Sequence, residues 1–292
     1  MVTRSGRFVR IRRVLLAMSA LVAATVAVGP AQASSAPLRF VALGDSYSAG
    51  SGVLPPDLTA PAQCERSTRN YPKVIAGQIG AHLTDVTCGG AKNGDFFTPQ
   101  SQGVPPQLDA VTGQTQLVTM TIGGNDSNVF IDAIIDCGTL GTAAAGQGSP
   151  CKDRFGSTFQ DTIDRTTYPA LVDALDAVRA KAPAASVAIL GYPRVLPATI
   201  GCFPLMPVAQ GDVPYLDGIQ ATLNDAIRRA ALATGATYVD FSAVSLGHDA
   251  CQPIGVRWIE PVVGGTNAVV VHPNALGEAQ MAVQTSTILH LR

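Results

Sequence analysis

The chain has 292 residues, of which 47% are hydrophobic and 14% are charged, a composition that supports a large buried core and excludes a disordered chain. The formal net charge is −1 at pH 7. Nucleic acid is therefore not expected as a partner, because binding phosphates needs a basic face that this chain lacks.

The first 33 residues have the pattern of a secretory signal peptide. A start rich in arginine precedes an apolar stretch from Val14 to Val28, and Ala31-Gln32-Ala33 follows. The apolar stretch is shorter than the roughly 20 residues of a membrane-spanning helix. We expect cleavage after Ala33 and export of residues 34–292 as one monomeric catalytic domain. Since the leader carries five arginines and no acid, the exported chain has a net charge of −6.

Alternating apolar strands and amphipathic helices make up the exported chain. Short apolar runs predict buried strands at residues 38–44, 84–88, 117–122, 186–193 and 237–241. Helical spacing predicts helices at residues 71–83, 168–182, 215–235 and 274–291. Such an alternation indicates a three-layer α/β/α domain with a five-stranded parallel sheet. Ligands bind at the carboxyl ends of the strands in such sheets, so the residues that follow the strands are the candidate site.

Six cysteines follow the leader, an even number that indicates disulfides in an exported chain. They lack the paired C-x-x-C spacing of zinc sites, and no metal or organic cofactor is implied. Six cysteines allow 15 pairings. We expect sequential neighbours to pair, each closing a loop-rich insertion: Cys64 with Cys88, Cys137 with Cys151 and Cys202 with Cys251.

Ser46 lies two residues past the first strand, in "GDSYSAGSG". Gly44 permits a sharp turn there, so the hydroxyl and backbone N–H of Ser46 can both face the crevice, as a nucleophile requires. Taken alone, Gly-Asp-Ser could equally form an Asx turn. A phosphate-binding loop is a weaker alternative, because the lysine of such loops is missing and no helix pattern follows directly.

Two other strand ends supply hydrogen-bond donors. The second strand is followed by "GGA", where the backbone N–H of Gly90 is not covered by a side chain. The third is followed by "GGND", where Asn125 presents an amide. The N–H of Ser46, the N–H of Gly90 and the amide of Asn125 would together form an oxyanion hole for a tetrahedral intermediate.

One of the four histidines is expected to act as the general base that takes the proton of Ser46. His82, at a predicted helix end, and His290, near the C-terminus, are expected to face solvent. His248 is a rival because Asp249 follows it, although adjacent residues tend to point apart. His272, in "VVVHPNALG", directly precedes Pro273 and the last helix, so we take it as the base.

Together these residues resemble the GDSL or SGNH hydrolases, named for a serine, glycine, asparagine and histidine that occur here in family order as Ser46, Gly90, Asn125 and His272. The cysteine layout is similar to that of secreted actinobacterial lipases and esterases of the Streptomyces type. The resemblance implies a flavodoxin-like sheet with strand order 2-1-3-4-5. It also implies hydrolysis of carboxylic esters through an acyl-enzyme on Ser46.

One position departs from the family pattern. Many members carry an aspartate three residues before the histidine, where this chain has Val269. Either a backbone carbonyl near Val269 accepts the Nδ1 proton of His272, or Asp249 or Asp240 reaches in. Because similar secreted members use a carbonyl, we expect a Ser46–His272 dyad with Val269 as the orienting residue.

The substrate is less well defined by the sequence. The loops 194–212 and 248–267 are expected to wall the crevice, and their apolar residues could line an acyl site or simply pack beneath the loops: Leu196, Phe203, Leu205, Met206 and Trp258. Few aromatic residues favour lipid or simple acyl esters over acetylated glycans. A phospholipase A, an acetyl-glycan esterase and a secreted binding module remain alternatives. A cutinase-type hydrolase is disfavoured because no G-x-S-x-G occurs.

Overall fold

Five parallel strands form one sheet in the order β2-β1-β3-β4-β5, which confirms the predicted fold class and strand order. The strands are β1 Arg39–Gly44, β2 His82–Asp85, β3 Leu117–Thr121, β4 Ser186–Leu190 and β5 Thr237–Val239. The computed structural model describes residues 1–3, 6 and 36–291. The predicted signal peptide lies almost wholly outside these residues.

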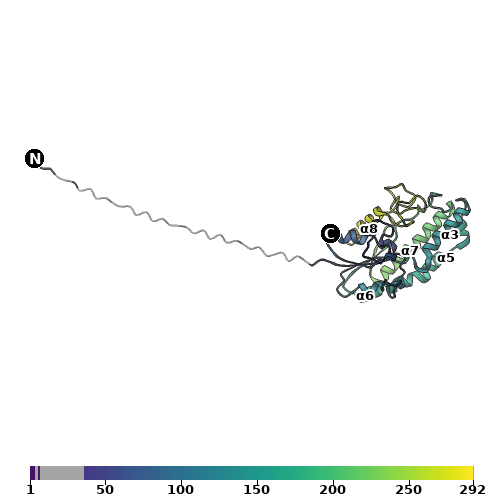
Figure 1. Ribbon diagram of the computed structural model, residues 1–292, viewed down its shortest axis with the longest axis horizontal. Helices are drawn as coiled ribbons and strands as arrows, with labels where there is room; N and C mark the ends of the chain where they lie inside the picture. The colour runs from purple at the N-terminus through teal and green to yellow at the C-terminus, as the bar shows by residue number, and fades with distance from the viewer. Residues whose placement is uncertain (4–5, 7–35, 292) are drawn as a thin grey trace. The chain divides into compact units, whose positions relative to one another are not determined.

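Helices cover both faces of the sheet (Figure 1). Right-handed crossovers in a sheet of this strand order place α2 on one face and α6 and α7 on the other. In agreement, α2 packs against α8 and α6 packs against α7. The helices are α1 Ser46–Ala49, α2 Tyr71–Ile79, α3 Val129–Ala143, α4 Pro150–Phe155, α5 Thr158–Thr162, α6 Tyr168–Lys181, α7 Val213–Thr234 and α8 Ala275–Ile288.

The second strand begins earlier than predicted. Helix α2 ends at Ile79 and is capped by Gly80, whose φ of 63° is the left-handed conformation that favours glycine. His82 is therefore the first residue of β2, paired with Arg39, and the prediction that it ends a helix is wrong. At the other end, β2 stops at Asp85, although the N–H groups of Val86 and Cys88 still donate to the carbonyls of Ala42 and Gly44 in β1.

Three helices between β3 and α6 lie outside the predicted elements. Residues 141–151, where no element is predicted, contain the end of α3 and the start of α4. Helix α3 contains Gly138 and Gly141, which weaken its sequence pattern, yet Gly141 allows the carbonyl of Pro207 to occupy the place where a β-carbon would stand. Likewise α1 is a single turn, too short for a periodic pattern.

Three disulfides join sequential cysteines, the same pairs that the sequence predicts: Cys64–Cys88, Cys137–Cys151 and Cys202–Cys251. The second links α3 to α4, and the third links the loops that follow β4 and β5. Among the helices of the described residues, none has the length and apolar character needed to cross a bilayer.

The close contact between β1 and β3 positions the start of the candidate site. Gly44 pairs with Thr121 in register, and its φ is 121°. A β-carbon on Gly44 would overlap the Thr121 carbonyl oxygen. Only glycine therefore allows the chain to turn at this point while the two strands stay paired.

We predict opposite effects of the same substitution at two glycines. Gly44→Ala is expected to lower the free energy of unfolding by at least about 2 kcal/mol, because it adds a steric clash and a strained φ. Gly77→Ala is expected to raise it by about 0.5–1 kcal/mol, because Gly77 is an exposed helical residue with open space around it. Urea unfolding of both variants tests this, and equal effects would contradict it.

Candidate active site

The end of β1 holds Ser46 at the mouth of a crevice. Asp45 is the N-cap of α1, and its carboxylate accepts a hydrogen bond from the Tyr47 N–H at 3.0 Å. Ser46 is therefore the first residue of the helix, where backbone N–H groups have no partner within the helix. The Ser46 side chain lines a crevice of about 420 Å³.

His272 contacts Ser46, although 226 positions separate the two residues in the sequence. The Nε2 atom of His272 lies 2.7 Å from the Ser46 Oγ. The Nδ1 atom lies 2.8 Å from the backbone carbonyl oxygen of Val270. Since a carbonyl only accepts, Nδ1 carries the proton and Nε2 is free to accept from the serine hydroxyl.

The orienting carbonyl belongs to Val270, so the prediction of Val269 is wrong by one residue. Val271 has a φ of 58°, which turns the chain so that the imidazole folds back over the carbonyl two residues before it. Neither acid considered from the sequence reaches His272. Asp249 accepts hydrogen bonds from Cys251 and Gln252, and Asp240 accepts one from Ser242.

The other histidines lie away from Ser46. The Nδ1 of His248 is 2.6 Å from the Val256 carbonyl, and its ring stacks on Trp258 with centroids 4.6 Å apart. His82 is exposed on the edge strand β2, and His290 is exposed beyond α8.

Gly90 and Asn125 line the same crevice as Ser46 and His272. The Asn125 amide donates one hydrogen bond to the Ala91 carbonyl at 3.1 Å, which leaves its second N–H for a ligand. Among the hydrogen bonds of residues 36–291, neither the Ser46 N–H nor the Gly90 N–H has an acceptor. Three residues that line the crevice thus each keep an N–H donor that no acceptor in residues 36–291 uses.

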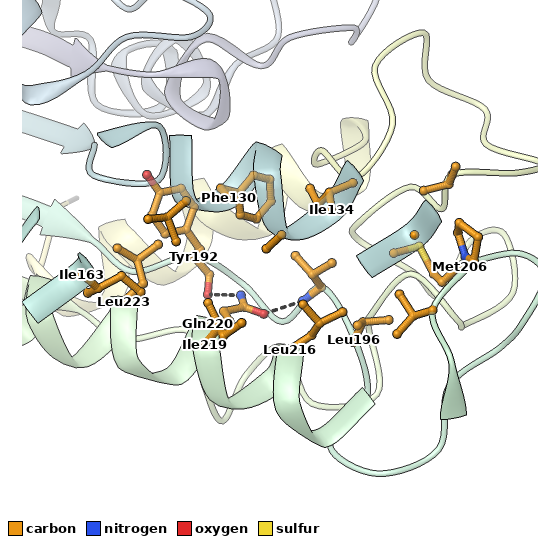
Figure 2. A pocket seen from close by; sticks show the side chains of 17 residues that line it. Phe130, Ile134, Ile163, Tyr192, Leu196, Met206, Leu216, Ile219, Gln220 and Leu223 are labelled. Carbon is orange, nitrogen blue, oxygen red and sulfur yellow. Dashed lines mark hydrogen bonds between the residues drawn. The ribbon is translucent and has the colours of Figure 1, made fainter. Parts of the chain in front are cut away.

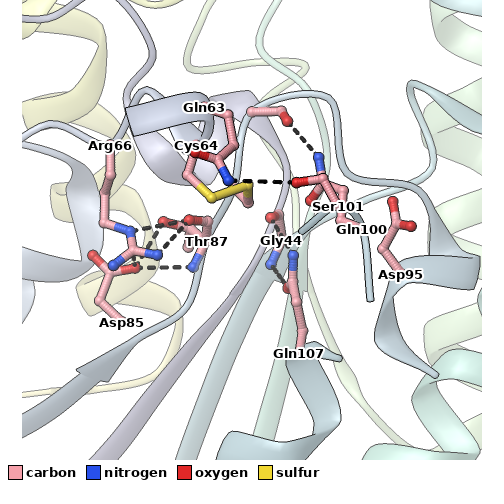
Figure 3. The surroundings of a disulfide bond; sticks show 12 residues. Gly44, Gln63, Cys64, Arg66, Asp85, Thr87, Asp95, Gln100, Ser101 and Gln107 are labelled. Carbon is pink, nitrogen blue, oxygen red and sulfur yellow. Dashed lines mark hydrogen bonds and ion pairs between the residues drawn. A yellow bond between two sulfur atoms is a disulfide. The ribbon is translucent and has the colours of Figure 1, made fainter. Parts of the chain in front are cut away.

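The loop that carries Gly90 is held from two sides, and Figure 3 shows the disulfide of Cys64 with the side chains of Gln100 and Gln107 near it. Cys64–Cys88 bonds it on one side, and the Gly89 N–H donates to the Cys64 carbonyl at 2.9 Å. The Gln100 amide donates to the Gly89 carbonyl at 2.7 Å on the other. Gln107, which no sequence motif singles out, accepts from the Gly44 N–H and donates to the Gly44 carbonyl, tying this region to the end of β1.

A buried acid holds the loop that carries His272. The carboxylate of Glu260 accepts hydrogen bonds from Arg257, Thr266 and Asn274 at 2.7–3.0 Å. Its backbone N–H donates to the His272 carbonyl at 3.0 Å. Desolvation raises the pKa of Glu260, but these hydrogen bonds outweigh it and the net shift is downward, so Glu260 stays ionised. No sequence motif marks Glu260, because its role depends on tertiary contacts.

Burial shifts the pKa values of His272 and of Asp45, the residue before Ser46. Burial lowers the pKa of His272, opposed by the hydrogen bond to the Val270 carbonyl, so the imidazole is neutral at neutral pH. Burial raises the pKa of Asp45 to about 6, although hydrogen bonds from Thr121 and Tyr192 oppose the rise. In the described part of the chain, no three His, Cys, Asp or Glu side chains lie together as metal ligands would.

The parallel sheet with serine, imidazole and clustered N–H donors at its carboxyl end defines the class of protein: a carboxylic ester hydrolase with a three-layer α/β/α fold. The chain belongs to the GDSL-like lipase/acylhydrolase family, whose model matches residues 42–280.

Relatives come from Streptomyces. The chain is 61% identical to "Lipase 2" of Streptomyces coelicolor over 270 residues, which cover 92% of this chain and 91% of that one. The crystal structure of phospholipase A1 from Streptomyces albidoflavus superposes with a TM-score of 0.72 at 30% identity, covering 86% of this chain and 99% of that one. The extracellular lipase of Streptomyces rimosus gives a TM-score of 0.70 at 28% identity, with the same coverage.

The pKa shifts predict the acid side of the pH profile. The neutral imidazole is the form that accepts a proton, so a lowered pKa of His272 keeps it available below pH 6.5. The pKa of Asp45 is about 6, so its carboxylate, which accepts hydrogen bonds next to Ser46, is also protonated in this pH range. We therefore expect kcat/KM for a soluble p-nitrophenyl ester to fall to half its plateau below pH 6.5. Rates measured between pH 4 and 9 test this; a midpoint above 6.5 would show that the imidazole is not held neutral.

Proposed function

We propose that this hydrolase works through an acyl-enzyme on Ser46 with His272 as general base. Nε2 of His272 takes the hydroxyl proton as Oγ attacks the ester carbonyl carbon. The negative oxygen is stabilised by the N–H groups of Ser46 and Gly90 and by the Asn125 amide. His272 then gives its proton to the alcohol that leaves. Water repeats these steps on the acyl-enzyme and releases the acid.

The observation that carries this proposal is the 2.7 Å contact between Ser46 Oγ and His272 Nε2. The distance is within hydrogen-bond range for proton transfer, and the Val270 carbonyl selects the tautomer that accepts. A binding module would not need a tautomer fixed in this way.

An apolar cavity beside the crevice supports an acyl chain as part of the substrate (Figure 2). Phe130, Ile134 and Tyr192 line both spaces, so a wall one side chain thick separates them. The cavity of about 60 Å³ is lined almost entirely by apolar groups. Its polar side chain, Gln220, is already bonded to backbone groups of Tyr192, Pro193 and Val195.

A space of this kind suits a hydrocarbon and suits neither water nor a sugar, because it offers no unused hydrogen-bond partner. A movement of Phe130 would join it to the crevice. Of the five apolar residues considered from the sequence, Leu196 and Met206 line the cavity. Phe203 and Leu205 are 41% and 40% exposed, and Trp258 packs on His248. These contacts favour lipid-type esters over acetylated glycans.

Export of the chain fits the same proposal. The N-terminal pattern of residues 1–33 predicts secretion, and three disulfides are typical of proteins that leave the reducing cytosol. A lipid-type ester outside the cell would then be the substrate.

A phospholipid is a second candidate for the ester. Lys92 is exposed at the crevice, 3.0 Å from the Asn128 side-chain oxygen, and its charge could bind a phosphate close to Ser46. The related structure from S. albidoflavus is that of a phospholipase A1. Release of fatty acid from phosphatidylcholine and from triglyceride, compared at equal enzyme, would separate the two substrates.

Ser46→Ala is expected to reduce hydrolysis of p-nitrophenyl butyrate by at least about 10⁴-fold, because within residues 36–291 the Ser46 hydroxyl is the group that hydrogen-bonds to Nε2 of His272. The variant should also lose covalent labelling by a fluorophosphonate. Circular dichroism and thermal unfolding control for the fold. A folded variant that keeps more than a tenth of the rate would contradict the proposal, and an inactive wild type that is not labelled would favour a binding module.

Filling the cavity is expected to shorten the acyl chains that are accepted. Ala133 lines the cavity, whereas Ala143 is exposed on the same helix. Ala133→Leu should lower kcat/KM for esters of 12–16 carbons by about 10–100-fold relative to acetate and butyrate, since each lost methylene site costs about 1–3 kcal/mol. Ala143→Leu is the matched control and should leave the chain-length profile unchanged. Identical profiles for both variants would place the acyl chain elsewhere.

A further inference from the structure

Two buried tyrosines line the same crevice as Ser46 and His272. Tyr47 and Tyr192 are 2% and 3% exposed, and their rings meet edge to face with centroids 5.0 Å apart. The Tyr47 hydroxyl donates to the Val271 carbonyl at 2.7 Å, next to His272. Neither hydroxyl takes part in the proton transfers between Ser46 and His272.

The hydroxyl of Tyr192 joins two parts of the site. It donates its one hydrogen to the Asp45 carboxylate at 2.5 Å. It also accepts the Gly124 N–H at 2.9 Å. Asp45 directly precedes Ser46, and Gly124 directly precedes Asn125. One oxygen atom therefore connects the residue before the nucleophile to the residue before the amide donor of the oxyanion hole.

We propose that Tyr192 is a positioning residue that sets the separation between Ser46 and the Asn125 amide. This rests on the proposed roles of Ser46 and Asn125. Donors stabilise the transition state only if they already point at the place where the negative oxygen forms. A displacement of about 1 Å within such a site can lower the rate about 10²-fold.

Other contacts allow the role of the hydroxyl to be separated from that of the ring. Without the Tyr192 hydroxyl, the Asp45 carboxylate still accepts from Thr121 at 2.6 Å and from the Tyr47 N–H. The turn before Ser46 therefore keeps its cap, while the Gly124 N–H loses its acceptor. The ring of Tyr192, which lines the apolar cavity, is unchanged in a phenylalanine variant.

The test compares Tyr192→Phe with Tyr215→Phe. Tyr215 is also buried, but its hydroxyl has no hydrogen-bond partner among the described residues, so its removal costs no contact. We expect Tyr192→Phe to lower kcat for p-nitrophenyl acetate about 10²-fold with KM changed less than about twofold. The affinity for a boronic acid that forms a tetrahedral adduct on Ser46 should fall by a similar factor. Tyr215→Phe should change neither quantity by more than about twofold.

A double-mutant cycle with Asn125→Ala tests whether Tyr192 acts through the oxyanion hole. If it does, the double variant should be only slightly slower than Asn125→Ala alone, because the misplaced donor is already absent. Additive losses, or wild-type kcat and boronate affinity in folded Tyr192→Phe, would overturn the inference. Fluorophosphonate titration counts the folded sites in each variant. All of these variants keep Ser46 and His272, so this inference can fail while the Ser46→Ala result still supports the proposed function.

Discussion

The buried carboxylate of Asp45 is the group on which the arrangement of the site depends. A carboxylate removed from water is stable only if donors surround it, and its donors come from three separate segments. Thr121 belongs to β3, Tyr192 follows β4, and the Tyr47 N–H belongs to α1. Satisfying one acid therefore brings together the ends of β1, β3 and β4, where Ser46 and Asn125 lie. Burial also raises the pKa of Asp45 to about 6, which makes this arrangement sensitive to mild acid.

The histidine side of the site uses a carbonyl where many serine hydrolases use an acid. The Val270 carbonyl fixes the tautomer of His272 but brings no full negative charge to stabilise the imidazolium. A lowered pKa of His272 is consistent with that difference. The orientation of the His272 imidazole then depends on the backbone of the loop that carries it. The buried Glu260 holds this loop, so its negative charge supports His272 through backbone position and without direct contact.

Particular residues show how far prediction from the sequence could go. Ser46, Gly90 and Asn125 each follow a predicted strand, and parallel strands end at the same edge of a sheet, so the sequence alone predicts that they lie close together. The roles of Gln107, Tyr192 and Glu260 could not be predicted, because each acts through partners far away in the chain. Helix α3 was not predicted, because its glycines interrupt the apolar periodicity of the sequence. The cavity between α3 and α7 could therefore not be predicted either.

Local patterns are enough to predict the α/β class and the candidate residues Ser46, Gly90, Asn125 and His272, because apolar runs ended by glycine mark the strands and short motifs follow them. The strand order came from the family resemblance, and the cysteine pairs were one choice among the pairings that six cysteines allow. Tertiary structure decided that the carbonyl of Val270 orients His272 rather than that of Val269, because a turn at Val271 with positive φ selects the carbonyl that lies under the ring. It also decided that an apolar cavity lies beside the crevice that Ser46 lines, with Phe130, Ile134 and Tyr192 in the wall between them. Packing between distant helices creates such a space, and no local pattern records it.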